Sequence, residues 1–198
     1  MAVAFALVLS AAYGAGSQYV GARVPGWGPD AAQLSAPWLV IAFIAGSTQK
    51  TPRRGALLGL AATVAALVGY GLMTLSPAEG AQYTLGSAHG FFISNLPAVV
   101  GGLVIGPLFG WFGQQWRTRR VIVGALVTAA ALCFEPLARH IPARIELALS
   151  DGRFAASPIG SHAVILAEVA AGLVLAAAVL VLARRAQQTR DSTPVSTS

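Results

Sequence analysis

Long apolar stretches without charges dominate this chain. Only 10% of its 198 residues are charged and 56% are hydrophobic, whereas a soluble domain carries about 25% charged residues. The uncharged stretches match the roughly 20 residues that a helix needs to cross a bilayer. In lipid, a helix satisfies its own backbone polar groups. The sequence therefore predicts an all-α, polytopic membrane protein and excludes a water-soluble globule.

Six membrane spans are predicted, separated by charged or Pro- and Gly-containing segments. The first has the Ala-rich core of a signal peptide but no positive n-region, so we expect it to be retained. Asp30 is expected to be the N-cap of the second span, and Pro97 and Pro107 to kink the fourth. The predicted spans indicate one domain, residues 1–186, and a disordered cytoplasmic tail, residues 187–198. The spans are residues 2–19, 30–48, 55–76, 88–111, 121–137 and 161–182.

Lys and Arg residues determine the predicted orientation, because cytoplasmic loops carry an excess of both. With both termini inside, nine of the 13 basic residues lie on the cytoplasmic side. Topology then explains the net charge of +6, and no nucleic acid partner is needed. We expect a six-transmembrane-helix bundle, N-in/C-in, with the lipid bilayer as its main partner.

Few residue patterns of known chemistry are present. The single cysteine, Cys133, lies in an apolar run, which excludes an intrachain disulfide and a Cys-based metal site. The three histidines lack metal-ligand spacing, and phosphate loops, paired Asp motifs and nucleophile elbows are absent from the sequence. We therefore predict no metal site and no cofactor. Any chemistry must come from isolated polar groups among apolar residues.

Small residues recur at four-residue spacing on two predicted spans. Gly102, Gly106 and Gly110 share one helix face, and Gly55 and Gly59 repeat the spacing. Such faces let membrane helices approach closely. We expect them to pack within the chain, with a homodimer through the Gly-x-x-x-Gly faces as the alternative.

Three segments in this region resemble a known family: residues 36–46, residues 54–59 leading to Gly69 and Tyr70, and residues 102–110 leading to Trp116. They are similar to a bacterial family of small membrane proteins of unknown function, over roughly residues 35–135. An aromatic residue often follows the position of Tyr70 in that family, where this chain has Gly71. The resemblance implies a six-helix fold in the bacterial cell (inner) membrane and no assigned activity.

Two acids inside predicted spans, Glu135 and Glu168, are the candidate catalytic residues. An ionisable residue at the centre of a membrane helix costs about 2.5–3.5 kcal/mol on insertion scales and faces the bundle interior. At about 1.5 Å per residue, both acids come to lie about 10 Å from the outer edge of the bilayer core. Glu135, beside Pro136, is alternatively a frayed helix end that reaches water.

A polar and aromatic layer is predicted around these acids in the outer half of the bundle. Asn95 is alternatively explained by the kink at Pro97, whose freed backbone groups its side chain would satisfy. A histidine here is alternatively interfacial, and the phenylalanines lipid-facing. The candidate substrate-binding residues are Trp38, Tyr70, His89, Phe91, Phe92, Ser94 and Asn95.

Acid catalysis on an isoprenoid uses all these features together. Burial disfavours the charged form of a glutamate, so a neutral acid can protonate an alkene or epoxide. Aromatic faces then stabilise the carbocation. In size and make-up the chain is similar to the small integral membrane terpene cyclases, although no motif is shared. We hypothesise a metal-independent membrane cyclase with a hydrophobic small-molecule substrate.

Two other hypotheses remain open. The chain is also similar in length and predicted topology to the solute-binding membrane subunits of vitamin uptake transporters, in which residues 21–30 with Trp27 would close the site. Paired acids would also serve a proton-coupled transporter, whereas a scaffold for other membrane proteins would need neither acid.

Overall fold

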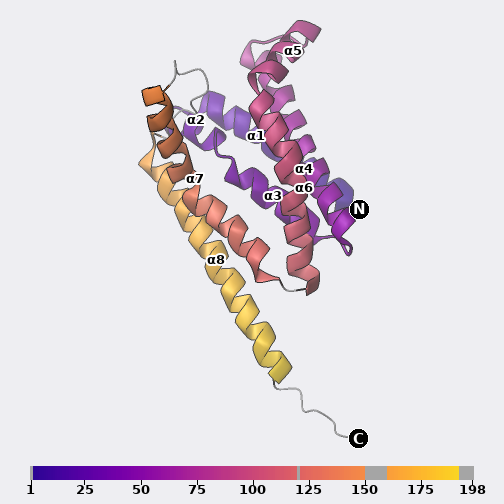
Figure 1. The fold of residues 1–198 in the computed structure, drawn as a ribbon. Coiled ribbons are helices and arrows are strands. Elements are labelled where there is room, and N and C mark those ends of the chain that lie inside the picture. Colours follow the sequence, from indigo (N-terminus) through magenta and orange to yellow (C-terminus); the bar gives the residue numbers. More distant parts are fainter. Residues whose placement is uncertain (1, 120, 150–159, 192–198) are drawn as a thin grey trace, which may run out of the picture.

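The computed structural model describes residues 2–119, 121–149 and 160–191, and in these the chain is helical without strands (Figure 1). The predicted all-α class is thereby confirmed. The elements are α1 (Ala2–Arg23), α2 (Trp27–Ala32), α3 (Ala36–Ser47), α4 (Pro52–Thr74), the 3₁₀ turn η1 (Pro77–Glu79), α5 (Leu85–Ser94), α6 (Leu96–Arg119), α7 (Ile122–Leu149) and α8 (His162–Asp191).

Four helical segments are long and apolar enough to cross a membrane: Val3–Arg23, Pro52–Thr74, Leu96–Arg119 and His162–Arg185. Two further apolar segments, Ala36–Ser47 and Ile122–Pro136, are shorter. The 12 residues of α3 extend about 18 Å, well short of a hydrocarbon core of about 30 Å. The structure therefore supports a helical membrane protein but not the predicted count of six spans.

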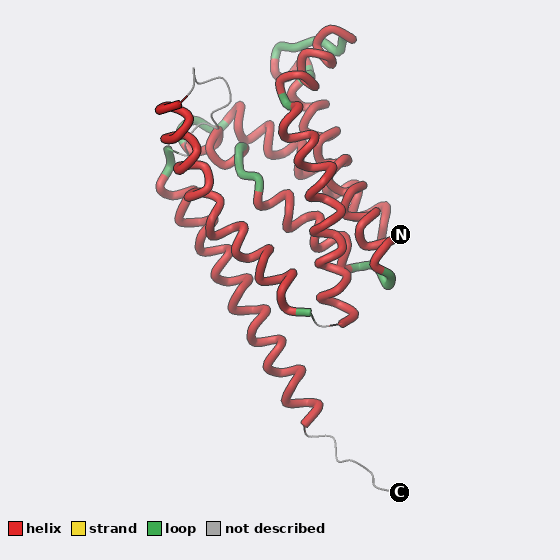
Figure 2. The backbone as a smooth tube through the Cα atoms, in the orientation of Figure 1, coloured by secondary structure: helices red, strands yellow, loops and turns green. Residues whose placement is uncertain are grey.

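The predicted second span is interrupted at residues 33–35, between α2 and α3 (Figure 2). Pro37 lies in the first turn of α3, where proline is tolerated because its missing N–H would have no helical partner. Asp30 is not the N-cap that we expected, since it lies inside α2. Its Oδ2 instead accepts a hydrogen bond of 2.7 Å from the backbone N–H of Ser161, immediately before α8.

The predicted fourth span is also divided. α5 ends at Ser94, Asn95 follows as its C-cap, and Pro97 lies in the first turn of α6. Pro107 is accommodated inside α6, which continues to Arg119. α7 continues through Pro136 to Leu149, so Glu135 does not lie at a frayed helix end. At the other end of the chain, α8 reaches Asp191, and residues 192–198 of the predicted tail lie outside the described residues.

The directions of the helices bring the ends of several helices to one side of the molecule. α1 and α4 run parallel, because Leu7 packs beside Leu58 near the start of α4 and Arg23 lies 3.9 Å from Glu79 just after its end. The C-terminal part of α6 returns to the start of α4, where Nε2 of Gln114 donates to the Lys50 carbonyl at 3.1 Å. The start of α1, the α3–α4 connection and the end of α6 therefore lie together.

α4 and α6 approach closely through their glycines. A Cβ added to Gly59 would lie 2.7 Å from the Cα of Gly110, and one added to Gly106 would lie 3.1 Å from the Cβ of Thr63. These faces are therefore filled by packing within the chain, as we expected. They are not available to a second copy in this arrangement, and the structure gives no support to the alternative homodimer.

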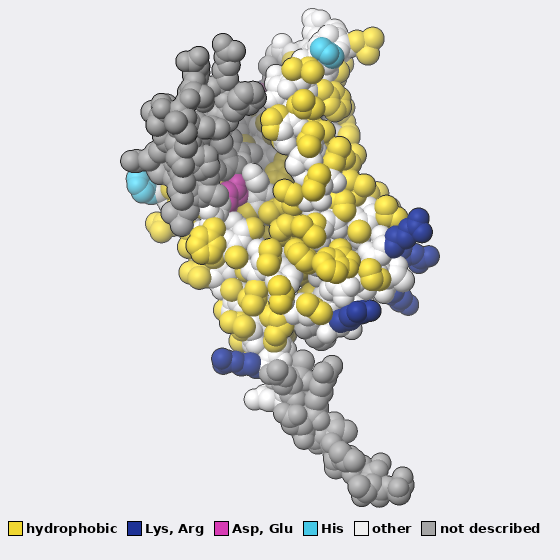
Figure 3. Space-filling view, in the orientation of Figure 1, with side chains coloured by type: hydrophobic (Ala, Val, Ile, Leu, Met, Phe, Trp, Pro, Cys, Tyr) yellow, Lys and Arg dark blue, Asp and Glu magenta, His cyan; other side chains and the backbone are white. Residues whose placement is uncertain are grey.

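The buried core is small and formed by several helices. Phe43 of α3, Ala125 of α7 and Val179 of α8 form one cluster. Many large apolar side chains point outward instead, such as Val104 (67% exposed) and Val174 (69% exposed). Hydrophobic side chains cover much of the face in Figure 3. An apolar exterior around a small core fits a lipid environment.

Candidate functional site

The break between α2 and α3 is the centre of the candidate site, and Glu135 of α7 holds it. The backbone N–H groups of Ser35 and Ala36 donate to Oε1 and Oε2 of Glu135, each at 2.6 Å. The first N–H groups of a helix have no partner within it, and a carboxylate there also complements the helix dipole. Glu135 is 9% exposed. Its two hydrogen bonds attach the first turn of α3 to α7.

Glu168 of α8 lies near the same break, at a cavity that Leu34 and Pro37 also line. The residue is 4% exposed and lines a cavity of about 440 Å³. We call this the Glu168 cavity; its other lining residues, all uncharged, are Trp27, Ala31, Leu34, Pro37, Leu132, Ala163, Val164, Ala167 and Ala171. The cavity therefore places one carboxyl group among mostly apolar side chains.

Tyr13 of α1 lies in the neighbourhood of both acids. Its phenol lies within electrostatic range of both Glu135 and Glu168, and its ring lies 6.0 Å from that of Trp38, edge to face. Both acids therefore converge on one region of the bundle, from different helices. The contact of Tyr13 with Trp38 depends on how α1 packs against α3.

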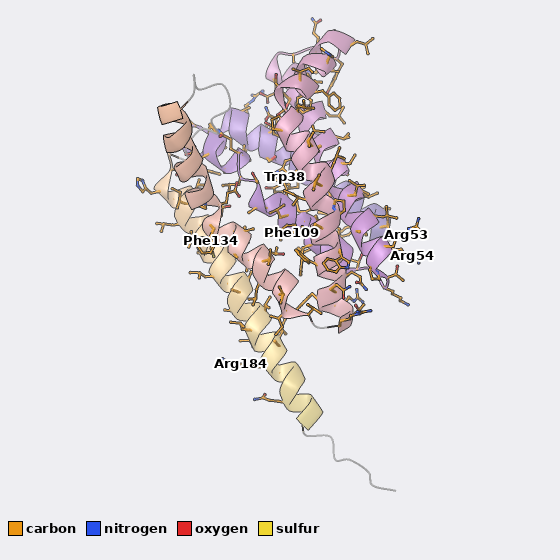
Figure 4. All side chains as sticks on the ribbon, viewed as in Figure 1. Trp38, Arg53, Arg54, Phe109, Phe134 and Arg184 are labelled. Carbon is orange, nitrogen blue, oxygen red and sulfur yellow. The ribbon has the colours of Figure 1, made fainter. Side chains whose placement is uncertain are left out.

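A row of aromatic rings extends from Tyr13 across the bundle. Trp38 and Tyr70 are 6.1 Å apart, Tyr70 and Phe91 are 6.1 Å apart, and Phe91 and Phe92 are 6.0 Å apart. These rings come from α1, α3, α4 and α5, with Trp38 in the first turn of α3 (Figure 4). Aromatic pairs at such distances contribute about 0.5–1.5 kcal/mol each beyond the area they bury.

Three of these rings line a second cavity, of about 410 Å³. We call it the aromatic cavity and define it by Trp38, Tyr70, Phe91, Asn95 and Leu34. Asn95 contributes little free polarity, because its Nδ2 donates to the carbonyl of Phe91 at 2.9 Å. Both cavities are within the range of about 300–1,000 Å³ that is typical of small-molecule sites.

Three of the candidate residues lie away from these two cavities. His89 and Ser94 are exposed on α5 and line neither of them. Phe92 is 56% exposed and lines a separate apolar cavity of about 360 Å³ between α4, α5 and α6. Of the candidate residues in this region, only Phe91 of α5 and Asn95, the C-cap of α5, line the aromatic cavity.

Leu34 is the residue that the sequence reasoning missed. It lies in the break itself and lines both the aromatic cavity and the Glu168 cavity. A leucine in an apolar run has no chemical signal of its own. The combination of Asp30 and Pro37 could have indicated a helix break at this point, because proline favours the start of a helix over its interior.

No protein-family model matches the chain, and neither a curated protein nor a solved structure shows a significant match to it. The resemblance of residues 35–135 to a bacterial membrane family therefore stays a prediction. Function has to be inferred from the two cavities, the aromatic row and the buried acids.

Proposed function

We propose that this chain is a membrane-embedded enzyme that binds an isoprenoid and protonates it with Glu168. The observation that carries the proposal is the position of Glu168, 4% exposed at a cavity lined otherwise by uncharged residues. Ligand sites of this kind, mostly apolar with a single well-placed polar group, suit long apolar molecules. The aromatic cavity adjoins it at Leu34.

The chemistry would be a cycle that needs no other reactant. The Glu168 carboxyl group donates its proton to an alkene carbon or an epoxide oxygen, and the π electrons or the breaking C–O bond leave a carbocation. A double bond of the same chain attacks the cation and closes a ring. Loss of a proton from the cyclised cation to the Glu168 carboxylate gives the product and restores the acid.

Glu135 has a different role in this proposal from the one its sequence position suggested. Each of its oxygens accepts a backbone hydrogen bond, from Ser35 and from Ala36. These bonds satisfy N–H groups that α3 cannot pair within itself. Glu135 therefore acts as a positioning residue for the break, and Glu168 is the catalytic acid.

We propose the N-in/C-in orientation, in a bacterial cell membrane. Exposed basic residues gather at the end where α4 begins and α6 and α8 end, and we call this the basic end; it comprises Lys50, Arg53, Arg54, Arg117, Arg119, Arg184 and Arg185. Figure 3 shows Lys and Arg side chains on this side of the molecule, and Figure 4 labels three of them. The positive-inside rule assigns such an end to the cytoplasm.

The test is product formation by the full chain in detergent or nanodiscs. Linear isoprenoid alcohols and their terminal epoxides are incubated with wild type, Glu168→Gln and the matched control Glu79→Gln, whose side chain lies at η1. We expect cyclised products from wild type and control, and a rate lower by about 10²–10⁴ in Glu168→Gln, the usual contribution of a general acid. Absence of any cyclised product from wild type would refute the catalytic proposal.

A carrier of apolar molecules is the second candidate. It is favoured by the separation of the acid from the aromatic row, since Trp38, Tyr70 and Phe91 do not line the Glu168 cavity. A carrier would return the isoprenoid unchanged, and Glu168→Gln would bind it as well as wild type does. A polar vitamin finds little to bind in either cavity, because most lining residues are apolar.

A further inference from the structure

The residues around Leu34 divide the space inside the bundle. Leu34 lines the aromatic cavity, the Glu168 cavity and a third cavity beside Tyr13. Of the residues that the structure describes, it is the one shared by the first two. The segment around the half-buried Leu34 therefore lies between a volume of about 410 Å³ and one of about 440 Å³, and Leu34 is in contact with both.

The backbone on both sides of Leu34 is fixed to other helices. On one side, the carboxylate of Asp30 accepts a hydrogen bond from the backbone of Ser161 at 2.7 Å. On the other, Glu135 accepts hydrogen bonds from the backbone of Ser35 and Ala36 at 2.6 Å. Because the backbone is held on each side, the Leu34 side chain is the part of the boundary between the two cavities that can change its conformation.

We propose that the two cavities are the halves of one bent binding site for a single elongated isoprenoid, and that Leu34 sets the chain length that fits. The polar end of the ligand would lie at Glu168 and its tail against Trp38, Tyr70 and Phe91. A rotation of the Leu34 side chain would let the chain pass from one half to the other. The isoprenoid as occupant is taken from the proposed function, but the inference does not depend on catalysis.

Chain length makes the inference measurable. Each methylene transferred from water to an apolar site strengthens binding by about fourfold, so an isoprene unit that is accommodated or excluded changes affinity strongly. A short chain needs one half of the site, whereas a long chain needs both. Changing the size of residue 34 should therefore affect long chains and leave short ones almost unchanged.

The experiment measures binding of geraniol, farnesol and geranylgeraniol to the full chain in nanodiscs. The variants are Leu34→Ala, Leu34→Phe and the control Val164→Ala, since Val164 lines the Glu168 cavity and not the aromatic cavity. We expect Leu34→Ala to raise the affinity for geranylgeraniol relative to geraniol by about tenfold or more, and Leu34→Phe to lower it by a similar factor. Val164→Ala should change all three affinities in parallel, because every chain places its head in the Glu168 cavity.

Stoichiometry on the wild-type protein gives a second measurement that needs no variant. One farnesol analogue with a photoreactive tail should bind per chain and crosslink to α4 or α5, while its head competes with ligands at the Glu168 cavity. Two independent molecules per chain, or equal dependence on chain length in the residue 34 and residue 164 variants, would overturn the single-site inference. If two molecules bind and cyclised product still forms, the single-site inference fails and the proposed function stands. If one molecule binds and no product forms, the proposed catalysis fails and the single-site inference stands.

Discussion

The carboxylate of Glu135 on α7 accepts a hydrogen bond of 2.6 Å from the backbone N–H of Ala36, the first residue of α3. The two residues are 99 positions apart in the chain. This contact decides where α3 begins, because it supplies a partner for an N–H group that the helix itself leaves unsatisfied. It also holds the segment that separates the two cavities.

Replacing Glu135 by Gln should destabilise the protein. The amide offers one carbonyl acceptor and places an NH₂ donor against a backbone N–H, so one of the two hydrogen bonds is lost. We expect a loss of about 1–3 kcal/mol, the cost of leaving a buried donor unsatisfied. Thermal unfolding in detergent measures it, with Glu79→Gln as control, because Glu79 faces the half-exposed Arg23 and exposed pairs contribute about 0–1 kcal/mol. Equal unfolding temperatures for the two variants would contradict the role of Glu135.

The close approach of α4 and α6 predicts a strong contrast between two glycines on the same helix. A Cβ at Gly110 would lie 2.8 Å from the Cα of Gly59, whereas one at Gly101 would meet nothing within 4 Å. Gly110→Ala should therefore lower stability by about 1–3 kcal/mol through overpacking, and Gly101→Ala should be neutral or slightly stabilising. Thermal unfolding of both variants in one detergent tests this, and similar stabilities would mean that the two helices pack differently.

Tryptophan fluorescence should report ligand entry into the aromatic cavity. Trp38 lines that cavity, while Trp111 lines none of the described cavities and pairs with Phe112 at 5.3 Å. Because Trp27 lines the Glu168 cavity, all variants carry Trp27→Phe. In this background farnesol should change the emission of the parent and of Trp111→Phe, and Trp38→Phe should lose most of that change. A full response in Trp38→Phe, with none in Trp111→Phe, would place the ligand elsewhere.

Cysteine labelling should reveal the orientation in the membrane. The variants replace Cys133 by Ala and carry one new cysteine, either Lys50→Cys or Gln82→Cys. Both positions are exposed, and they lie beyond opposite ends of α4. We expect an impermeant thiol reagent to label position 82 on intact cells, and position 50 only after the membrane is opened. The reverse pattern would overturn the N-in/C-in proposal without affecting the fold.

Much of the fold could be predicted from local patterns. Apolar runs indicated helices at the positions of α1, α3, α4, α6, α7 and α8, and the glycines of α4 and α6 indicated close packing. The interruptions at residues 33–35 and 95 shortened or divided two expected spans. Proline restricts the backbone around it, but where a helix stops also depends on which distant groups can satisfy its exposed N–H groups.

For the site, the sequence by itself determined which residues can carry charge within an apolar chain. Glu135 and Glu168 were found in this way, because an acid in a long apolar run is costly and therefore conspicuous. Only the tertiary structure distinguishes the surroundings of the two acids. Glu135 accepts hydrogen bonds from two backbone N–H groups at the break, whereas Glu168 lines a cavity whose other lining residues are uncharged. Composition and spacing are local properties, but the partner of a buried carboxyl group depends on which helices the fold brings to it.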